Sequence, residues 1–165
     1  GAQIRFNKQD NKNGLRFVSR VSTKLIDELD ALDGNKGNTT FGHLLSSKIN
    51  ESSVLDEKNG SKLEAAGLLY NGESYKTFSA VVVGIPEANY NTEISTRTYI
   101  EYTDANGNSR MHLFTEKESR NYNGAYHTTI SRVAKFIVDY DAIRLDNSTQ
   151  ELQEYIRMLA SKCTD

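Results

Sequence analysis

Residues 92–114, TEISTRTYIEYTDANGNSRMHLF, decide the fold. The first half alternates strictly, so that one face carries Ile94, Thr96, Thr98, Ile100 and Tyr102, and the other carries Ser95, Arg97, Tyr99 and Glu101. Such alternation is typical of a β-strand, whose successive side chains point to opposite faces of a sheet. The Asn-Gly pair within residues 104–108 predicts a tight turn that returns the chain into a second strand at residues 110–114. The sequence therefore predicts a long antiparallel hairpin.

Two further alternating runs, residues 2–6 and 14–21, predict a second hairpin. Its apolar side chains are expected to face inward: Ile4, Phe6, Leu15, Phe17 and Val21. Its arginines are expected to face outward: Arg5, Arg16 and Arg20. A short helix is expected to follow, with Ser22 or Thr23 as its cap, Leu25, Leu29 and Leu32 along one face, and Gly34 as its end.

The middle of the chain predicts two buried strands and one long loop. Residues 41–45 are apolar enough for a short buried strand. Residues 77–85, with Phe78, Val81, Val82 and Val83, are apolar and β-branched enough for a central strand. Gly84 and Pro86 end that strand. The polar residues 46–62 predict a surface loop with at most one helical turn.

The last third of the chain changes to helical spacing. Two apolar stripes predict two helices, one with Ile130, Val133, Ala134, Ile137 and Val138, the other with Leu152, Tyr155, Ile156 and Leu159. A capping box at residues 148–151, in which Ser148 accepts from the backbone and Glu151 reaches back, marks the start of the second. We predict an α+β fold: a mostly antiparallel β-sheet or β-sandwich core with two C-terminal helices, in a single domain of residues 1–165. Whether the core is a sandwich or one sheet packed on helices stays open, because both give alternating strands.

Composition excludes several function classes. With 20 basic and 22 acidic residues among 165, the chain carries a formal charge of -2, so it lacks the basic footprint of a nucleic-acid-binding protein. No apolar run approaches the length that spans a membrane. Cys163 is the only cysteine, which excludes an intrachain disulfide and a cysteine-rich zinc site.

No catalytic, cofactor or metal motif is present. The three histidines, His43, His112 and His127, are far apart and show no metal-binding spacing, and no phosphate-binding glycine loop or serine nucleophile motif occurs. Residues 104–108 resemble the start of a calcium loop, but glycine falls at the wrong position and Thr115 stands where a closing glutamate is needed. We therefore expect no catalytic residue, no metal and no cofactor. A hydrolase with paired carboxylates from distant strands remains an open alternative.

Two candidate ligand-binding patches emerge from the tyrosines and basic residues. The first is the segment of residues 120–127, with Arg120, Tyr122, Tyr126 and His127; the second is the outward strand face, with Arg97, Tyr99 and His112. Tyrosine rings offer apolar faces for stacking, and basic side chains orient a sugar or a peptide. The alternative is that the tyrosines of residues 120–127 pack over the core, and that the outward strand residues are an ordinary solvated face.

Several short stretches carry a family resemblance: GAQIR at residues 1–5, GLRF at 14–17, FGHLL at 41–45, and residues 85–90 leading to RTYI at 97–100. Together they resemble an accessory module found near the ends of large secreted or cell-wall-associated proteins of Gram-positive gut bacteria. The resemblance implies an extracellular or cell-surface location, neighbouring domains in a larger chain, and attachment to a glycan or protein ligand without catalysis. Gly1 is typical of a residue left by tag cleavage, so a signal sequence is expected to have been trimmed. The absence of tryptophan weakens a carbohydrate-binding role, and a purely structural spacer is a further alternative.

Overall fold

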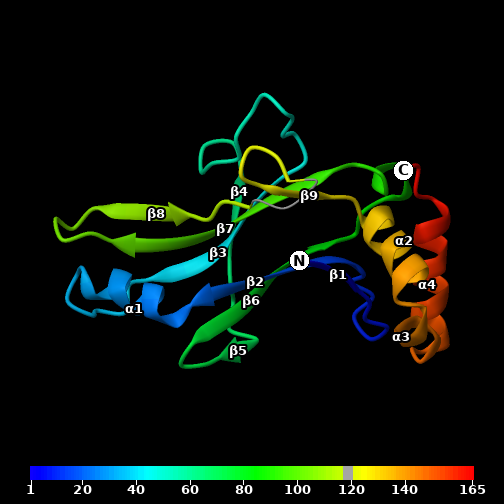
Figure 1. The fold of residues 1–165 in the computed structure, drawn as a ribbon, viewed down its shortest axis with the longest axis horizontal. Helices are drawn as coiled ribbons and strands as arrows, with labels where there is room; N and C mark the ends of the chain where they lie inside the picture. Colours follow the sequence, from blue (N-terminus) through cyan, green and yellow to red (C-terminus); the bar gives the residue numbers. More distant parts are fainter. Residues whose placement is uncertain (117–120) are drawn as a thin grey trace. The chain divides into compact units, whose positions relative to one another are not determined.

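The computed structural model describes residues 1–116 and 121–165, and it confirms an α+β fold with antiparallel sheets and helices at the C-terminus. Figure 1 shows the elements. In chain order they are β1 (Ala2–Arg5), β2 (Gly14–Ser22), α1 (Thr23–Ala31), β3 (Thr40–Ser46), β4 (Ser61–Glu64), β5 (Tyr70–Asn71), β6 (Tyr75–Val83), the 3-10 helix η1 (Glu87–Asn89), β7 (Ile94–Thr103), β8 (Ser109–Leu113), β9 (Tyr126–Thr128), α2 (Ile130–Tyr140), α3 (Ala142–Asp146) and α4 (Gln150–Ser161).

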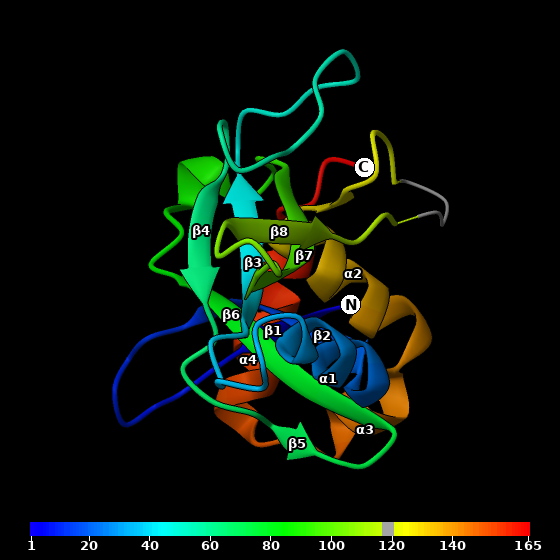
Figure 2. The same cartoon turned by 90° about the vertical axis from the view of Figure 1, so that its left-hand side faces the viewer.

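The strands form two sheets. The first has the order β1-β2-β6-β5, and the second has the order β4-β3-β7-β8, with β9 also paired to β7. Figure 2 shows β4, β3, β7 and β8 of the second sheet together. Both hairpins predicted from alternation, β1-β2 and β7-β8, are present as antiparallel pairs.

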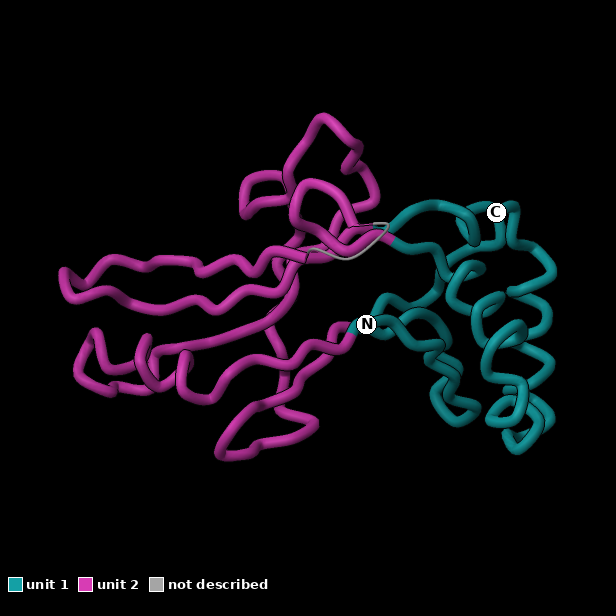
Figure 3. Tube along the Cα trace, viewed as in Figure 1, with its two compact units in different colours: residues 1–17, 81–94, 128–165 teal, residues 18–80, 95–127 magenta. Residues whose placement is uncertain are grey.

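The chain divides into two compact units, coloured in Figure 3. Unit 1 comprises residues 1–17, 81–94 and 128–165, and unit 2 comprises residues 18–80 and 95–127. The expectation of a single domain stays a prediction.

The β7-β8 turn forms as its residue types dictate. Asp104 Oδ1 accepts hydrogen bonds from the backbone N–H groups of Asn106 and Asn108, both at 2.9 Å. Gly107 adopts φ +81°, a left-handed conformation that glycine takes without strain. The turn therefore fixes the register in which Ile100 lies opposite His112.

Unit 2 has a buried core drawn from strands and helix. Val21 of β2, Ile26 of α1, Phe78 of β6 and Ile100 of β7 pack together, and every one of them is buried. In α1, Ile26 is buried and the predicted stripe residues Leu25 and Leu29 pack against the same core. Leu32, the C-cap, is 45% exposed, so the stripe ends before it. Ser22 caps this helix by accepting a hydrogen bond from the N–H of Leu25.

The opposite face of the second sheet is also covered, which corrects the expectation of a half-solvated sheet. Tyr99 is 0% exposed and packs with Leu44, Leu55 and Ala125. Leu55 belongs to the polar segment that the sequence predicts as a surface loop, and it is fully buried. Leu55 and the partly buried Ile49 of the same segment therefore pack that segment against the sheet, and the predicted exposure of Arg97 and Tyr99 is wrong.

Three strands are absent from the sequence prediction: β4, β5 and the three-residue β9. β4 begins at Ser61, inside the predicted loop, and β5 contains only two residues. β4 is exposed along its whole length, so it carries no buried face from which alternation is readable.

In unit 1, α2 and α4 confirm the two predicted helices, and a short α3 lies between them. The cap of α4 corrects the prediction, because Thr149 rather than Ser148 accepts the hydrogen bond from Leu152 N–H, at 3.3 Å. Within the described residues, every helix is too short or too polar to cross a membrane.

Candidate functional site

The hairpin of β5 and β6, in unit 2, presents two tyrosines on one side of the first sheet. Tyr70 lies opposite Thr77, and Tyr75 is two residues before Thr77 on the same strand, so the two rings share a face. Their centroids are 4.8 Å apart with an angle of 34° between the ring planes. Arg20 of β2 places its guanidinium carbon 4.0 Å from the centre of the Tyr75 ring. We call Arg20, Tyr70 and Tyr75 the tyrosine–arginine surface.

This surface is open to solvent. Tyr70 is 51% exposed, Tyr75 is partly exposed, and Arg20 is exposed. The neighbouring β2 residue Val21 is fully buried, because alternation turns it to the core side of the strand. The face that carries Arg20 is therefore the outer face of this sheet.

A glycine in the turn allows the Tyr70 ring to take its position. The two strands are joined by residues 72–74, Gly-Glu-Ser, and Gly72 N–H donates to Tyr75 O at 3.0 Å. A Cβ atom on Gly72 would lie 2.4 Å from Tyr70 Cε1, closer than real contacts allow. The side chain of Tyr70 therefore lies over the turn only because residue 72 is glycine.

The first residue of α1 anchors the turn. Thr23 Oγ1 donates to Gly72 O at 2.7 Å, and Thr23 N–H donates to Ser74 O at 3.2 Å. Thr23 is buried, so both hydrogen bonds are shielded from water. A turn held from both ends fixes the rings before a ligand arrives, which lowers the entropy cost of binding.

Arg20 is one of several described cations of unit 2 that have no acidic partner, whereas other cations of this unit are paired. Lys62 pairs with Glu101 at 3.1 Å and Arg110 with Asp104 at 2.9 Å. In the part of the chain that the structure describes, no carboxylate lies within ion-pair distance of Arg20. Its guanidinium is therefore held by the Tyr75 ring and keeps its hydrogen-bond donors for another group.

The sequence-predicted residues Arg97 and Tyr99 lie inside unit 2. Arg97 donates from Nε to Phe114 O at 2.9 Å and from Nη1 to Leu55 O at 3.0 Å. Burial lowers the pKa of the Arg97 guanidinium, and burial raises the pKa of Tyr99 to about 12. Both side chains hold the loop at Leu55 and the strand together.

His112 is not part of the same surface. It lies opposite Ile100 in the β7-β8 ladder, so it shares the face of Ile100 and not that of Tyr99. Its ring meets the edge of Phe114, with centroids 4.9 Å apart. The structure therefore separates Arg97, Tyr99 and His112 into two faces.

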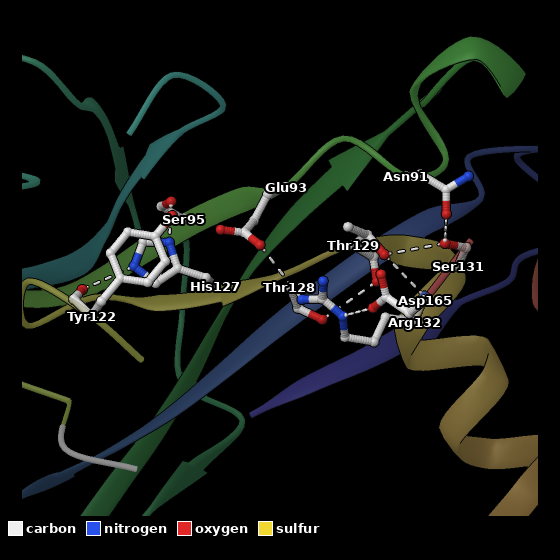
Figure 4. A network of polar contacts seen from close by, with 10 residues as sticks. All are labelled: Asn91, Glu93, Ser95, Tyr122, His127, Thr128, Thr129, Ser131, Arg132 and Asp165. Carbon is white, nitrogen blue, oxygen red and sulfur yellow. Dashed lines mark hydrogen bonds and ion pairs between the residues drawn. The ribbon is translucent and has the colours of Figure 1, made fainter. Parts of the chain in front are cut away.

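The segment of residues 120–127 is built around an internal stack, shown in Figure 4. The rings of Tyr122 and His127 are parallel within 7°, with centroids 3.5 Å apart. His127 is buried, its Nε2 lies 2.9 Å from Tyr122 O, and its Nδ1 lies 2.6 Å from Ser95 Oγ. Because a carbonyl only accepts, Nε2 carries a hydrogen, and in the neutral ring Nδ1 accepts from the Ser95 hydroxyl.

The remaining two residues of this patch are Tyr126 and Arg120. Tyr126 is partly buried at the start of β9. Arg120 lies outside the described residues. A ligand-binding role for this segment stays a prediction, although Tyr122 and His127 already contact each other.

In residues 1–116 and 121–165, two serine–histidine hydrogen bonds occur, and both are internal. Ser95 with His127 is one, and Ser19 with His43, at 2.7 Å, is the other. Ser95 is 1% exposed, and Ser19 Oγ is engaged by His43 and by Thr98 Oγ1 at 2.5 Å. A nucleophile must reach its substrate, so these pairs serve packing.

The carboxyl groups with clear pKa shifts point away from acid catalysis. The pKa values of three carboxyls are lowered: Asp10 by a hydrogen bond from Arg5, Asp104 by the backbone N–H of Asn108, and Glu151 by its own backbone N–H. A general acid at neutral pH needs a raised pKa. Among the described residues, no cluster of three or more His, Cys, Asp or Glu side chains is placed to hold a metal ion.

In unit 1, Figure 4 shows a polar cluster at the start of α2. Asn91 Oδ1 accepts from Ser131 Oγ at 2.6 Å and from Thr164 N–H at 3.1 Å, while Asn91 Nδ2 donates to Lys162 O at 2.8 Å. Thr129 caps the helix by accepting from Arg132 N–H at 3.0 Å. The cluster ties the end of the chain to the start of α2.

Sequence reasoning missed the tyrosine–arginine surface, although a sequence feature marks it. Tyr70 and Tyr75 flank an Asn-Gly pair, which is a hairpin turn signature, and alternation already places Arg20 outward. No family model, curated protein or solved structure matches the chain.

Proposed function

We propose that this protein is a non-catalytic binding module whose tyrosine–arginine surface contacts a carbohydrate. The observation that carries the proposal is a pair of solvent-facing tyrosine rings, 4.8 Å apart, on a hairpin anchored by Thr23. An extracellular or cell-surface location and neighbouring domains in a larger chain, as implied by the resemblance, belong to the same proposal.

Tyrosine pairs suit carbohydrates for a physical reason. One side of a sugar ring carries C–H groups that pack on an aromatic face, while its hydroxyls need hydrogen-bond partners nearby. Tyr70 supplies an exposed apolar face and Arg20 supplies donors beside it. Tyrosine here takes the place of tryptophan, which the chain lacks.

A glycan array and cell-wall polysaccharide preparations test the proposal, with wild type, Tyr70→Ala and Tyr140→Ala compared. Tyr140 is the control because it is 77% exposed, pairs with another aromatic ring, Phe136, and belongs to unit 1. We expect saturable binding that Tyr70→Ala weakens about 10-fold or more, the order of 1–2 kcal/mol for one aromatic contact, and that Tyr140→Ala leaves unchanged.

Two results would contradict the proposal. One is the absence of binding to every glycan and cell-wall preparation. The other is binding that Tyr70→Ala leaves intact, which would move the site away from this surface.

A further inference from the structure

We propose that the sugar recognised by the tyrosine–arginine surface is acidic and carries a carboxylate that Arg20 binds. This inference rests on the proposed carbohydrate function and specifies the ligand class. Both the charge of this surface and the geometry of its side chains support an acidic ligand.

The charge of the surface is unbalanced. Arg20 has no carboxylate within ion-pair distance among the described residues, whereas Lys24, four residues along the chain, approaches Glu28 at 3.8 Å. Lys76 Nζ binds Asn71 Oδ1, and the ladder places both residues on the other side of the hairpin from Tyr70. Glu73, in the turn, is exposed, and it lies beyond ion-pair distance of Arg20. The outer face that unit 2 presents here is therefore cationic at Arg20.

The guanidinium is oriented and still able to bind. A cation–π contact holds it over the Tyr75 ring, with Cζ 4.0 Å from the ring centre, and no carboxylate of the described residues lies within ion-pair distance of its N–H groups. Those N–H groups form a planar fork that matches the two oxygens of a carboxylate. An arginine held in this way loses less conformational freedom on binding than a free one.

The spacing fits one ligand that touches both ends of the surface. Tyr75 lies between the other two residues, with its ring centre 4.8 Å from that of Tyr70 and 4.0 Å from Arg20 Cζ. A sugar ring packed on Tyr70 can therefore extend an exocyclic carboxylate, or that of an adjacent unit, towards Arg20. Tyr75 acts as a positioning residue for Arg20.

Matched ligand pairs test the inference. A panel of uronic-acid oligosaccharides is titrated in parallel with the methyl esters of the same oligosaccharides, which keep the sugar rings and remove the charge. The proteins are wild type, Arg20→Gln, Tyr70→Ala, and Lys36→Gln as a control that removes one exposed charge elsewhere in unit 2. Circular dichroism and thermal unfolding confirm that each variant is folded.

We expect the acid form of at least one oligosaccharide to bind wild type about 10-fold more tightly than its ester, as for one charge-assisted hydrogen-bonded pair. Arg20→Gln should abolish that preference while ester binding persists, Tyr70→Ala should weaken both forms, and Lys36→Gln should behave as wild type. The preference should also shrink as salt is added.

The outcomes separate the two proposals. Equal binding of acid and ester, a preference that survives Arg20→Gln, or binding of neutral glycans only would overturn the acidic-sugar inference and leave the carbohydrate function standing. Failure of every glycan, acidic or neutral, to bind would overturn both.

Discussion

His43 shows how burial sets the chemistry of a single residue. Its side chain lies within unit 2, with Nε2 2.7 Å from Ser19 Oγ, and its Nδ1 has no hydrogen-bond partner among the described residues. Burial disfavours the charged ring and lowers the pKa of His43 to about 4. The folded protein therefore holds this histidine neutral throughout the range in which histidine is normally half protonated.

Stability should fall in mild acid because of this residue. The unfolded chain protonates His43 near its ordinary pKa of 6.5, whereas the folded chain does so only near 4. Between those values the unfolded state binds more protons, so stability is complete above pH 6.5 and is lost as the pH falls towards 4. Urea unfolding at pH 7.5 and pH 4.5 should show a loss of about 2 to 3 kcal/mol from this group.

The control for this measurement is His43→Gln, which cannot titrate. Other groups also titrate in this range, so the quantity to compare is the difference between the wild-type and His43→Gln pH profiles. A variant with the same acid dependence as wild type would show that His43 does not hold a depressed pKa.

Gly42 is the second residue whose environment dictates its identity. A Cβ atom there would lie 2.2 Å from Leu63 O and 2.7 Å from the Tyr99 hydroxyl oxygen. Since Leu63 contributes backbone from β4, the strand itself must move. Gly42→Ala should therefore lower the free energy of unfolding by about 1 to 3 kcal/mol, as overpacking typically does. Gly67→Ala, where a Cβ meets open space, should change stability by less than about 0.5 kcal/mol. Urea unfolding of the two variants checks this, and equal effects would contradict the close approach.

Long elements with a buried face were predictable, whereas short or fully exposed ones, including the three-residue β9, were not. The sequence predicts β2, β6 and β7 because their apolar side chains recur with period two or fill a continuous run. β4 and β5 are short and exposed, so they pair through backbone hydrogen bonds that leave no pattern in side-chain polarity. The helices α2 and α4 were predicted from their stripes, while the cap of α4 shifted by one residue from Ser148 to Thr149.

The β5-β6 hairpin should depend on its anchor at Thr23. Thr23→Val keeps the shape of the side chain but removes the hydroxyl group. The carbonyl oxygen of Gly72 then loses the hydrogen bond that it accepts from Thr23. We expect a loss of about 1 to 2 kcal/mol in stability, and weaker glycan binding although no residue of the tyrosine–arginine surface has changed. Urea unfolding and glycan titration of this variant measure the two effects.

The matched control for the anchor is Ser22→Ala. It removes the helix cap at the adjacent position, where Ser22 accepts from Leu25 N–H at 3.2 Å, and does not touch the turn. If both variants weaken binding equally, loss of α1 stability in general rather than loss of the turn anchor is responsible.

At the scale of the whole molecule, contacts between distant parts of the sequence decide which tyrosine and arginine side chains are exposed. Sequence reasoning proposed tyrosine and arginine side chains as ligand contacts, but Tyr99 and Arg97 are buried by Leu55, from a segment more than forty residues earlier in the chain. A single buried leucine in a polar stretch carries no periodic pattern, so its covering of the strand was not predictable. Tyr70, Tyr75 and Arg20 come together only through pairing of β2, β5 and β6, which local patterns do not specify.

The measurement that tests the central claim most directly is a nuclear magnetic resonance titration of the isotope-labelled chain with the best glycan from the array. We predict that the perturbed signals belong to Arg20, to residues 70–76 and to the Tyr70 and Tyr75 rings, with little change at Tyr122 and His127. Perturbation centred on residues 121–127, with the β5-β6 hairpin unaffected, would contradict the claim that the tyrosine–arginine surface is the binding site.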